Sequence, residues 1–170
     1  MQQADKLWDY HDPATGCSLP APYFFDPEVF AAEREAIFLR SWHLVGHVNE
    51  FRTPGAFVCQ DIFEQSVVVV AGRDGTIRAF HNACRHRGNR LINQRRGTVG
   101  TVVRCAYHSW CYGLDGALRS APRSEGLADF DKAGWGLAPV RLEVFAGFVY
   151  VTLDDGAEPI AAMAAGAEAE

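Results

Sequence analysis

Apolar positions follow a helical period near the start of the chain. Between Glu28 and Arg40, apolar residues recur at helical spacing among glutamates and arginines, which is typical of an amphipathic helix. Asp26 and Pro27 stand directly before this stretch, and aspartate is a good N-cap while proline suits the first helical position. The pattern therefore predicts one helix over this stretch, preceded by an extended arm over residues 1–25.

From Trp42 onward the pattern changes to short alternating or β-branched runs separated by turn signals. The turns fall at residues 72–75, 115–116 and 146–147 and are rich in glycine and aspartate. Runs spaced this closely predict antiparallel hairpins. The expected strands cover residues 42–48, 66–71, 76–80, 98–104, 112–114, 117–118, 140–145 and 147–153. The predicted fold class is mainly β, with small antiparallel sheets or a compact barrel and an N-terminal helix.

Composition places the chain among ordinary globular proteins. Of its 170 residues, 48% are hydrophobic and 22% are charged, which suits one core-forming domain with appendages. The longest apolar run, Val67 to Ala71, has the length of a buried strand and not of a membrane span. The first residues lack the basic and apolar regions of a secretory signal, so we expect a cytoplasmic protein. The net charge of −5 argues against general nucleic-acid binding.

These patterns divide the chain into three regions. Residues 1–41 form the arm and the helix, and residues 42–153 form the β domain. Residues 154–170 are rich in Ala, Gly and Glu and have little to bury, so we expect a linker or the start of a further domain.

Two short motifs in the β domain each supply one thiolate and one imidazole. They are Cys84-x-His86 and Cys105-x-x-His108. A 2Fe–2S cluster in which two histidines replace two cysteines on one iron requires this set of ligands. The cysteines would hold one iron and the histidines the other. Neutral imidazoles in place of thiolates remove negative charge, which raises the reduction potential.

Two other interpretations of the motifs remain open. Single cysteines and histidines are often ordinary core residues, although two matching motifs beside expected strands argue against this. Two Cys and two His also satisfy a tetrahedral zinc ion. Zinc fingers usually pair Cys with Cys and His with His, however, whereas each motif here mixes the two.

The other cysteines and histidines are given structural interpretations or none. Cys111 follows His108 by three residues and is expected to be a buried non-ligand. Cys17 and Cys59 belong to no motif. His43 and His47 have a spacing that would suit one helix face, but residues 42–48 alternate like a strand, so we expect this pair to be structural.

The residues around the two motifs resemble a known family. Residues 81–91 (HNACRHRGNRL) and 105–112 (CAYHSWCY) closely resemble the Rieske domain of the large (alpha) subunits of ring-hydroxylating, or Rieske non-haem iron, oxygenases. The likeness extends from about Tyr23 through Leu153. It implies a Rieske-type iron–sulfur fold and a 2Fe–2S cofactor whose ligands are Cys84, His86, Cys105 and His108.

The resemblance also implies an electron-transfer role. A ferredoxin, or a flavin- and iron–sulfur-containing reductase, would supply single electrons derived from NAD(P)H. The cluster would pass them to a mononuclear Fe(II) in a catalytic oxygenase domain or a neighbouring subunit, for O₂-dependent mono- or dioxygenation. The full enzyme of this family is a homo-oligomer.

Catalytic residues are not expected in this chain itself. In the family, two His and one carboxylate hold the mononuclear iron in a domain C-terminal to the Rieske domain. The sequence beyond residue 153 contains no histidine. The alternatives are a stand-alone Rieske ferredoxin, which would not need the helix and the arm, and an inactive truncated product. The sequence indicates no substrate.

Three positions bear on the reduction potential. Respiratory Rieske proteins carry an extra cysteine in each cluster loop and a serine near the second histidine, whereas the matching positions here are Asn89, Tyr107 and Trp110. No disulfide can join the loops, and fewer donors face the cluster sulfurs. We therefore expect a potential toward the low end of the Rieske range of about −150 to +300 mV.

Positive charge gathers around the motifs. Six of the 16 Lys and Arg residues lie there: Arg85, Arg87, Arg90, Arg95, Arg96 and Arg104. They would steer an acidic redox partner, or they are solvated loop charges, and both interpretations stay open.

Overall fold

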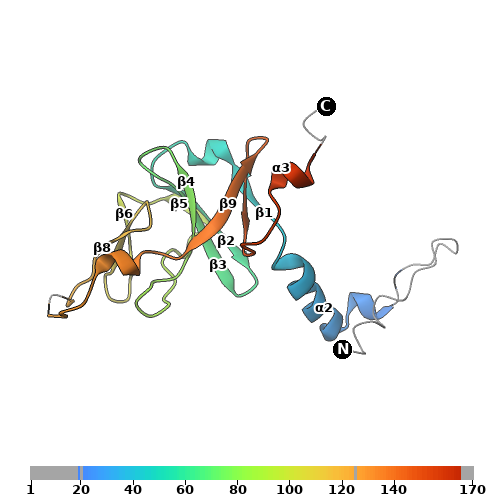
Figure 1. Ribbon diagram of the computed structural model, residues 1–170, viewed down its shortest axis with the longest axis horizontal. Coiled ribbons are helices and arrows are strands. Elements are labelled where there is room, and N and C mark those ends of the chain that lie inside the picture. The colour runs from blue at the N-terminus through green and yellow to red at the C-terminus, as the bar shows by residue number, and fades with distance from the viewer. Residues whose placement is uncertain (1–18, 20, 125, 166–170) are drawn as a thin grey trace. The chain divides into compact units, whose positions relative to one another are not determined.

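The computed structural model describes Leu19, residues 21–124 and residues 126–165. The chain divides into two compact units, residues 1–40 and residues 41–170, whose elements are labelled in Figure 1. Most of the arm expected over residues 1–25, including Cys17, lies outside the described residues, as do residues 166–170 of the expected tail.

The first unit contains a helix in two parts. Its elements are η1 (Ala21–Phe24), α2 (Pro27–Glu33) and η2 (Arg34–Phe38). Asp26 caps α2 and Pro27 is its first residue, so the predicted start is confirmed. The single regular helix expected up to Arg40 is wrong, because η2 is a π-helix in which the N–H of Leu39 bonds to the carbonyl of Arg34, five residues back. Apolar spacing over so few residues does not distinguish a π-turn from an α-turn.

The second unit is built on a seven-stranded antiparallel sheet. In spatial order its strands are β1 (His43–His47), β10 (Phe148–Thr152), β9 (Pro139–Phe145), β4 (Ile77–His81), β3 (Gln65–Ala71), β2 (Ala56–Ile62) and β5 (Arg96–Thr98). The predicted hairpins β3–β4 and β9–β10 are confirmed. Ala146 and Gly147, between β9 and β10, both have positive φ, as a two-residue hairpin turn requires. The run Val67–Ala71 is at most 3% exposed, which confirms the expected buried strand.

A second sheet of three strands contains the remaining β structure. Its strands are β6 (Val102–Arg104), β7 (Cys111–Gly113) and β8 (Leu118–Ser120). The single strand expected over residues 98–104 is therefore wrong, because β5 belongs to the large sheet and β6 to the small one. Gly100 separates the two strands, and the N–H of Val99 bonds to the carbonyl of Gly55 at the edge of the large sheet. A β-branched run does not reveal that the chain changes sheets within it.

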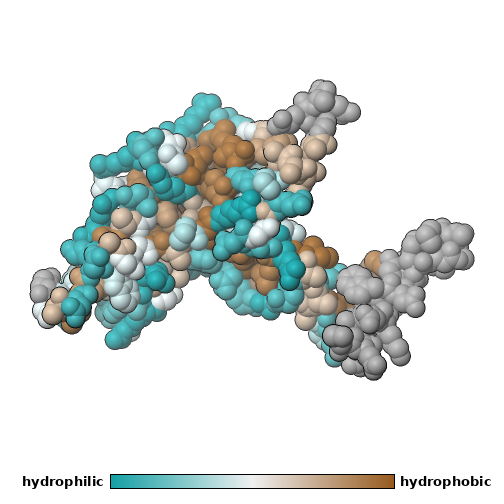
Figure 2. All heavy atoms as spheres, in the orientation of Figure 1, coloured by the Kyte–Doolittle hydropathy of each residue, from teal (hydrophilic) through white to brown (hydrophobic). Residues whose placement is uncertain are grey.

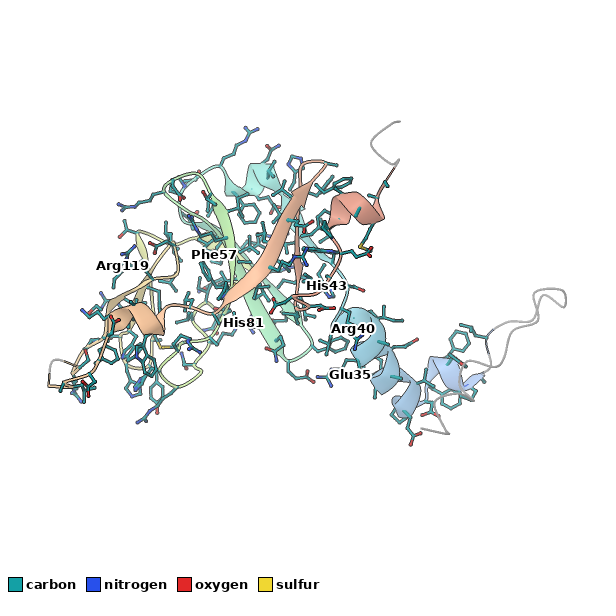
Figure 3. All side chains as sticks on the ribbon, viewed as in Figure 1. Glu35, Arg40, His43, Phe57, His81 and Arg119 are labelled. Carbon is teal, nitrogen blue, oxygen red and sulfur yellow. The ribbon has the colours of Figure 1, made fainter. Side chains whose placement is uncertain are left out.

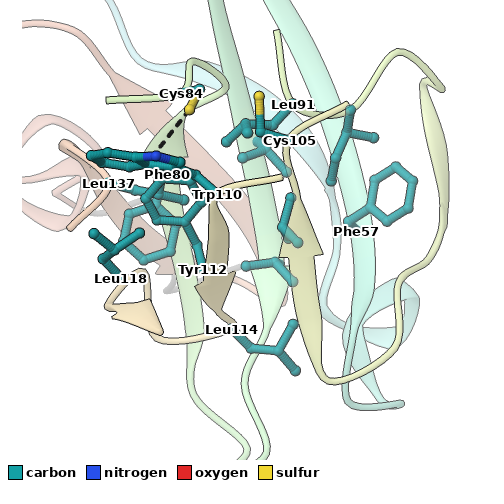
Figure 4. Close-up of a cluster of buried hydrophobic side chains, with 14 of the residues drawn as sticks. Phe57, Phe80, Cys84, Leu91, Cys105, Trp110, Tyr112, Leu114, Leu118 and Leu137 are labelled. Atoms are coloured by element: carbon teal, nitrogen blue, oxygen red, sulfur yellow. Dashed lines mark hydrogen bonds between the residues drawn. The ribbon is translucent and has the colours of Figure 1, made fainter. Parts of the chain in front are cut away.

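The main core lies between the two sheets. It combines Phe57, Val68 and Phe80 of the large sheet with Val103, Tyr112 and Leu118 of the small one. Cys84 and Cys105 belong to the same cluster of buried side chains, as Figure 4 shows. The candidate site therefore forms one end of the core and not an addition to the surface.

Three short helical elements complete the second unit: η3 (Val48–Phe51), η4 (Lys132–Trp135) and α3 (Ile160–Met163). The segment leading into α3 is held against β9 and β1. The indole N–H of Trp42 donates to the carbonyl of Glu158 at 2.8 Å, and the N–H of Ile160 donates to the Glu143 carboxylate at 2.8 Å. Ile160 is buried, so this part of the Ala-rich region packs on the domain.

The visible surface in Figure 2 is mostly hydrophilic, with an apolar area over β9 and its neighbours. Leu44, Val144 and Phe148 are the large exposed apolar residues of these strands. No helix among the described residues is long and apolar enough to cross a membrane.

Candidate metal centre

The first motif forms a tight loop after β4, Cys84–Asn89, hereafter loop 1. The carbonyl of Cys84 accepts the N–H of Gly88 at 2.8 Å, and the N–H of Cys84 donates to the carbonyl of Asn89 at 2.8 Å. Gly88 has a φ of 67°, the left-handed region that glycine occupies without strain. The loop therefore closes on Cys84, with His86 near its middle.

The second motif forms the same kind of loop between β6 and β7, Cys105–Trp110, hereafter loop 2. The carbonyl of Cys105 accepts the N–H of Ser109 at 3.0 Å, and the N–H of Cys105 donates to the carbonyl of Trp110 at 2.8 Å. Ser109 has a φ of 59° and so adopts the conformation that Gly88 adopts in loop 1. Both cysteines thus occupy the first position of equivalent loops.

The four predicted residues come together where the two loops meet. Cys84 and Cys105 are only 3% and 1% exposed, while His86 and His108 are half-buried. The two imidazole rings lie 4.8 Å apart, centroid to centroid, at 72°. The Nδ1 atom of His108 is buried and has no hydrogen-bond partner within the described structure. Buried ring nitrogens normally have a hydrogen-bond partner, so one without such a partner is a candidate metal ligand.

Two side chains donate to the cysteine sulfurs. The sequence analysis gave Tyr112 no role, and it named Asn89 only as a position without a cysteine and not as a donor. Tyr112 is fully buried, and its hydroxyl lies 3.3 Å from Cys84 Sγ while accepting the N–H of Arg85 at 3.0 Å. Since that hydroxyl oxygen already accepts, its own proton is free to point at the sulfur. The side-chain amide of Asn89 donates to Cys105 Sγ at 3.7 Å. The position of Tyr112 in an expected strand was the one feature of the sequence that could have indicated this role, because the hydroxyl of a buried tyrosine needs a hydrogen-bond partner.

Figure 4 draws the Cys84–Tyr112 hydrogen bond as a dashed line among the apolar side chains of the core. Burial raises the pKa of the Cys84 thiol, and the hydrogen bond from Tyr112 partly offsets this rise. Burial also acts to raise the pKa of Cys105, but hydrogen bonds from the N–H groups of Tyr107 and His108 and from the Cys84 and Asn89 side chains together hold this pKa below its usual value.

His108 is arranged to stay neutral. Burial lowers its pKa, and the nearby charges of His86, Arg87 and Arg123 lower it further. A neutral imidazole is the form that binds a metal. Burial and the neighbouring Cys84 sulfur keep the pKa of Tyr112 well above its usual value, so its hydroxyl remains a proton donor.

The ligand arrangement bears on the two candidate metal groups. Among the described residues, no three His, Cys, Asp or Glu side chains converge closely enough to hold one metal ion. A structural zinc ion takes four such ligands around a single centre. A binuclear cluster takes only two protein ligands at each iron, one pair of thiolates and one pair of imidazoles. The residues present, two thiols and two imidazoles on paired loops, fit the 2Fe–2S cluster.

Aromatic rings surround the two histidines. Trp110 stacks on His86 with centroids 4.9 Å apart and planes at 7°, and Tyr107 lies 3.8 Å from the ring of His108. An open hollow of about 770 Å³ lies beside both histidines, and its lining includes Arg87 and Arg123 but no Asp or Glu among the described residues. The histidine end of the site is thus the accessible end, with two arginines in its lining, whereas the cysteines face the core.

The other histidines and cysteines discussed in the sequence analysis that the structure describes have structural positions. His43 and His81 belong to β1 and β4 of the large sheet, and both are labelled in Figure 3. The strand expected around His43 and His47 is confirmed as β1, and His47 Nδ1 accepts the N–H of Asn49 at its end. Cys111 is buried and donates to the carbonyl of Ser109.

The six arginines around the two motifs fall into two groups, those with an ion-pair partner and those without one. Arg90 pairs with Asp61 at 3.0 Å and Arg96 with Glu50 at 2.6 Å, so these two have structural partners. The others are exposed and form no ion pair within the described part of the chain: Arg85, Arg87, Arg95 and Arg104.

Comparison with known proteins agrees with this geometry. The family model described as "Rieske [2Fe-2S] domain" matches residues 41–131, more than half of the chain. The chain belongs to the Rieske [2Fe-2S] domain family. This confirms the predicted mainly β, Rieske-type fold and the resemblance stated from the sequence.

The relatives of this Rieske domain are oxygenase subunits. It is 38% identical over 149 residues to the carnitine monooxygenase oxygenase subunit of Escherichia coli (strain K12), covering 88% of this chain and 40% of that protein. It is 45% identical over 138 residues to the glycine betaine monooxygenase oxygenase subunit of Chromohalobacter salexigens, covering 81% of this chain and 31% of that protein. The crystal structure of the apo form of a quaternary ammonium Rieske monooxygenase superposes with a TM-score of 0.81 at 33% identity, covering 88% and 43% of the two chains. The chain thus spans about two fifths or less of the length of these relatives and corresponds to their Rieske portion.

Proposed function

We propose that Cys84 and Cys105 hold one iron of the 2Fe–2S cluster and that His86 and His108 hold the other. The paired loops support this assignment, because each supplies one thiol, at equivalent loop positions, and one imidazole. The observation that carries most weight is the buried, unpartnered Nδ1 of His108 beside the ring of His86. No ordinary core histidine leaves a buried nitrogen unsatisfied without cost.

We infer that the domain transfers single electrons. When bound, a Rieske cluster accepts and releases one electron at a potential set by its ligands and their hydrogen bonds. The chain's own residues divide this task. Cys84, Cys105, Tyr112 and the apolar core exclude water from one side, and the two histidines face the open hollow where a redox partner would approach.

The proposed partners follow from that hollow and from the relatives. The donor is a ferredoxin or an iron–sulfur flavin reductase, and the exposed Arg85 and Arg87 favour an acidic surface on it. The acceptor is a mononuclear iron(II) in a catalytic oxygenase domain or a neighbouring subunit, within a homo-oligomeric enzyme. The carnitine and glycine betaine relatives point to O₂-dependent oxidation of a quaternary ammonium compound.

An EPR spectrum of the anaerobically purified, dithionite-reduced protein tests the cluster, with iron and acid-labile sulfide measured on the same sample. We expect two irons and two sulfides per chain. We also expect a rhombic signal whose average g value is lower than that of 2Fe–2S proteins with four cysteine ligands. An EPR-silent protein that contains one zinc per chain would contradict the proposal.

The electron-transfer role needs a second measurement. The reduced protein is mixed with oxidised ferredoxin or with an intact quaternary ammonium monooxygenase whose own cluster is oxidised, and reoxidation is followed by visible absorption. Transfer to the oxygenase supports the proposed role, whereas exchange with the ferredoxin alone would favour a stand-alone carrier.

A further inference from the structure

Two side chains cross between the loops in opposite directions. From the strand after loop 2, the hydroxyl of Tyr112 reaches Cys84 Sγ of loop 1 at 3.3 Å. From loop 1, the side-chain amide of Asn89 reaches Cys105 Sγ of loop 2 at 3.7 Å. Each cysteine sulfur therefore has one side-chain donor, and each donor comes from the other half of the site.

The amide of Asn89 is firmly positioned for this contact. Its Nδ2 atom also donates to the carbonyl of Arg90 at 2.8 Å, and its main-chain carbonyl accepts the N–H of Cys84 at 2.8 Å. Asn89 is half-buried and Cys105 is 1% exposed, so little water competes for the sulfur. A hydrogen bond to a buried sulfur is stronger than the same bond in water.

We propose that Asn89 sets the reduction potential of the cluster and ties loop 1 to loop 2 through its N–H···S bond to Cys105. This inference rests on the proposed ligand set, in which Cys105 binds iron. Reduction adds one negative charge, part of which resides on the coordinating sulfurs. An N–H donor stabilises the reduced state more than the oxidised state, because hydrogen bonds to more highly charged acceptors are stronger. Asn89 is therefore a positioning and tuning residue and not a ligand.

The decisive variant is Asn89→Leu in the full chain with its cluster. Leucine branches at Cγ as asparagine does and is larger, but it has no N–H, so it removes the donor and leaves no void. We expect the variant to have a lower reduction potential. At a fixed applied potential, its ratio of reduced to oxidised cluster should fall by up to about tenfold, which corresponds to a decrease of 59 mV in the one-electron reduction potential. A redox titration followed by circular dichroism and EPR measures this shift.

Asn93→Leu is the matched control. Asn93 is exposed, four residues further along the chain, and no described hydrogen bond joins it to either cysteine. Its potential is expected to equal that of the unmodified protein. An equal potential in the Asn89→Leu protein, with a full cluster content, would overturn the inference.

A second measurement covers the case in which the leucine variant binds little cluster. The unmodified protein is labelled with ¹⁵N-asparagine, reduced, and studied by pulsed EPR for weak nitrogen couplings. We expect an ¹⁵N coupling in the unmodified protein. The Asn93→Leu protein, labelled in the same way, should retain this coupling. The Asn89→Asp protein should lose it, since aspartate keeps the shape of asparagine without the side-chain nitrogen. The absence of any side-chain ¹⁵N coupling in the unmodified protein would also overturn the inference.

These outcomes separate the inference from the proposed function. A protein with the mixed-ligand EPR signal and no effect at Asn89 refutes only the role of Asn89. A protein without that signal refutes the ligand set itself, and the role of Asn89 falls with it.

Discussion

Loop 1 and loop 2 share one backbone conformation but are closed in different ways. Loop 2 connects two paired strands, so the ladder pairs Arg104 with Cys111 and Val103 with Tyr112 directly beneath it. Beneath loop 1 there is only one isolated bridge, between Ala83 and Arg90. A ladder of paired strands therefore supports loop 2, whereas loop 1 has no such ladder beneath it.

The side chain of Asn82 takes the place of the missing ladder under loop 1. It is 1% exposed, and it donates to the carbonyl of Ile92 at 2.7 Å and accepts the N–H of Ile92 at 3.0 Å. A carboxamide thus makes the pair of hydrogen bonds that a neighbouring strand would make. Below loop 1 the Asn82 side chain supplements a single backbone bond, from the N–H of Leu91 to the carbonyl of Asn82. Below loop 2 the strand ladder makes all such bonds. This difference determines where substitutions are expected to do most damage.

Removing a thiolate from either loop is expected to have the largest effect. Cys84→Ala and Cys105→Ala each leave one iron with a single protein ligand, so we expect loss of the Rieske EPR signal and of bound iron. Cys111→Ala is the matched control, because Cys111 is also buried and its thiol donates to the carbonyl of Ser109. A Cys111→Ala protein without a cluster, or a Cys105→Ala protein with one, would refute the ligand set.

Asn82→Ala is expected to have the next largest effect. It leaves the N–H of Ile92 buried without its partner, while the carbonyl of Ile92 keeps the hydrogen bond from Arg90, so we expect a cost of about 1–3 kcal/mol in the free energy of unfolding. Urea unfolding of the cluster-free protein measures this cost. The exposed Asn93→Ala serves as the control and should change the stability by less than about 0.5 kcal/mol. A cost at Asn82 as small as that at Asn93 would show that loop 1 is not closed by this side chain.

Gly88→Ala tests the position of loop 1 that has the left-handed backbone conformation. A Cβ at Gly88 would meet no atom within 4 Å, so the whole cost comes from the left-handed backbone, about 1–2 kcal/mol. Gly100→Ala is the comparison, since a Cβ there is also free of contacts and its φ is not positive. Equal stabilities of the two variants would mean that loop 1 relaxes out of its observed conformation.

Ser109→Gly tests the same position in loop 2 and is expected to have the smallest effect. Glycine relieves the left-handed strain at Ser109 but makes the unfolded chain more flexible, so we expect a net gain of at most about 1 kcal/mol. Ser109→Ala keeps the strain and should gain nothing. Destabilisation by Ser109→Gly would indicate that the serine hydroxyl has a role that its backbone conformation does not explain.

The sequence predicted well whatever depends on neighbours along the chain. Asp26 and Pro27 mark the start of α2, and the turn at residues 146–147 joins β9 to β10, because capping and turn chemistry involve only a few adjacent residues. It failed at residues 98–104, where one β-branched run serves two sheets, and at the π-helix after Glu33. Neither break changes the local polarity pattern, so periodicity could not reveal it.

The sequence by itself identified the Rieske domain, because its two mixed Cys and His motifs and the residues around them are short segments that can be read along the chain. Only the tertiary structure decided how the two motifs are surrounded. The Tyr112–Cys84 contact spans 28 residues and the Asn89–Cys105 contact spans 16. Such contacts depend on how the two sheets pack around a shared core, and no local pattern in the sequence records that packing.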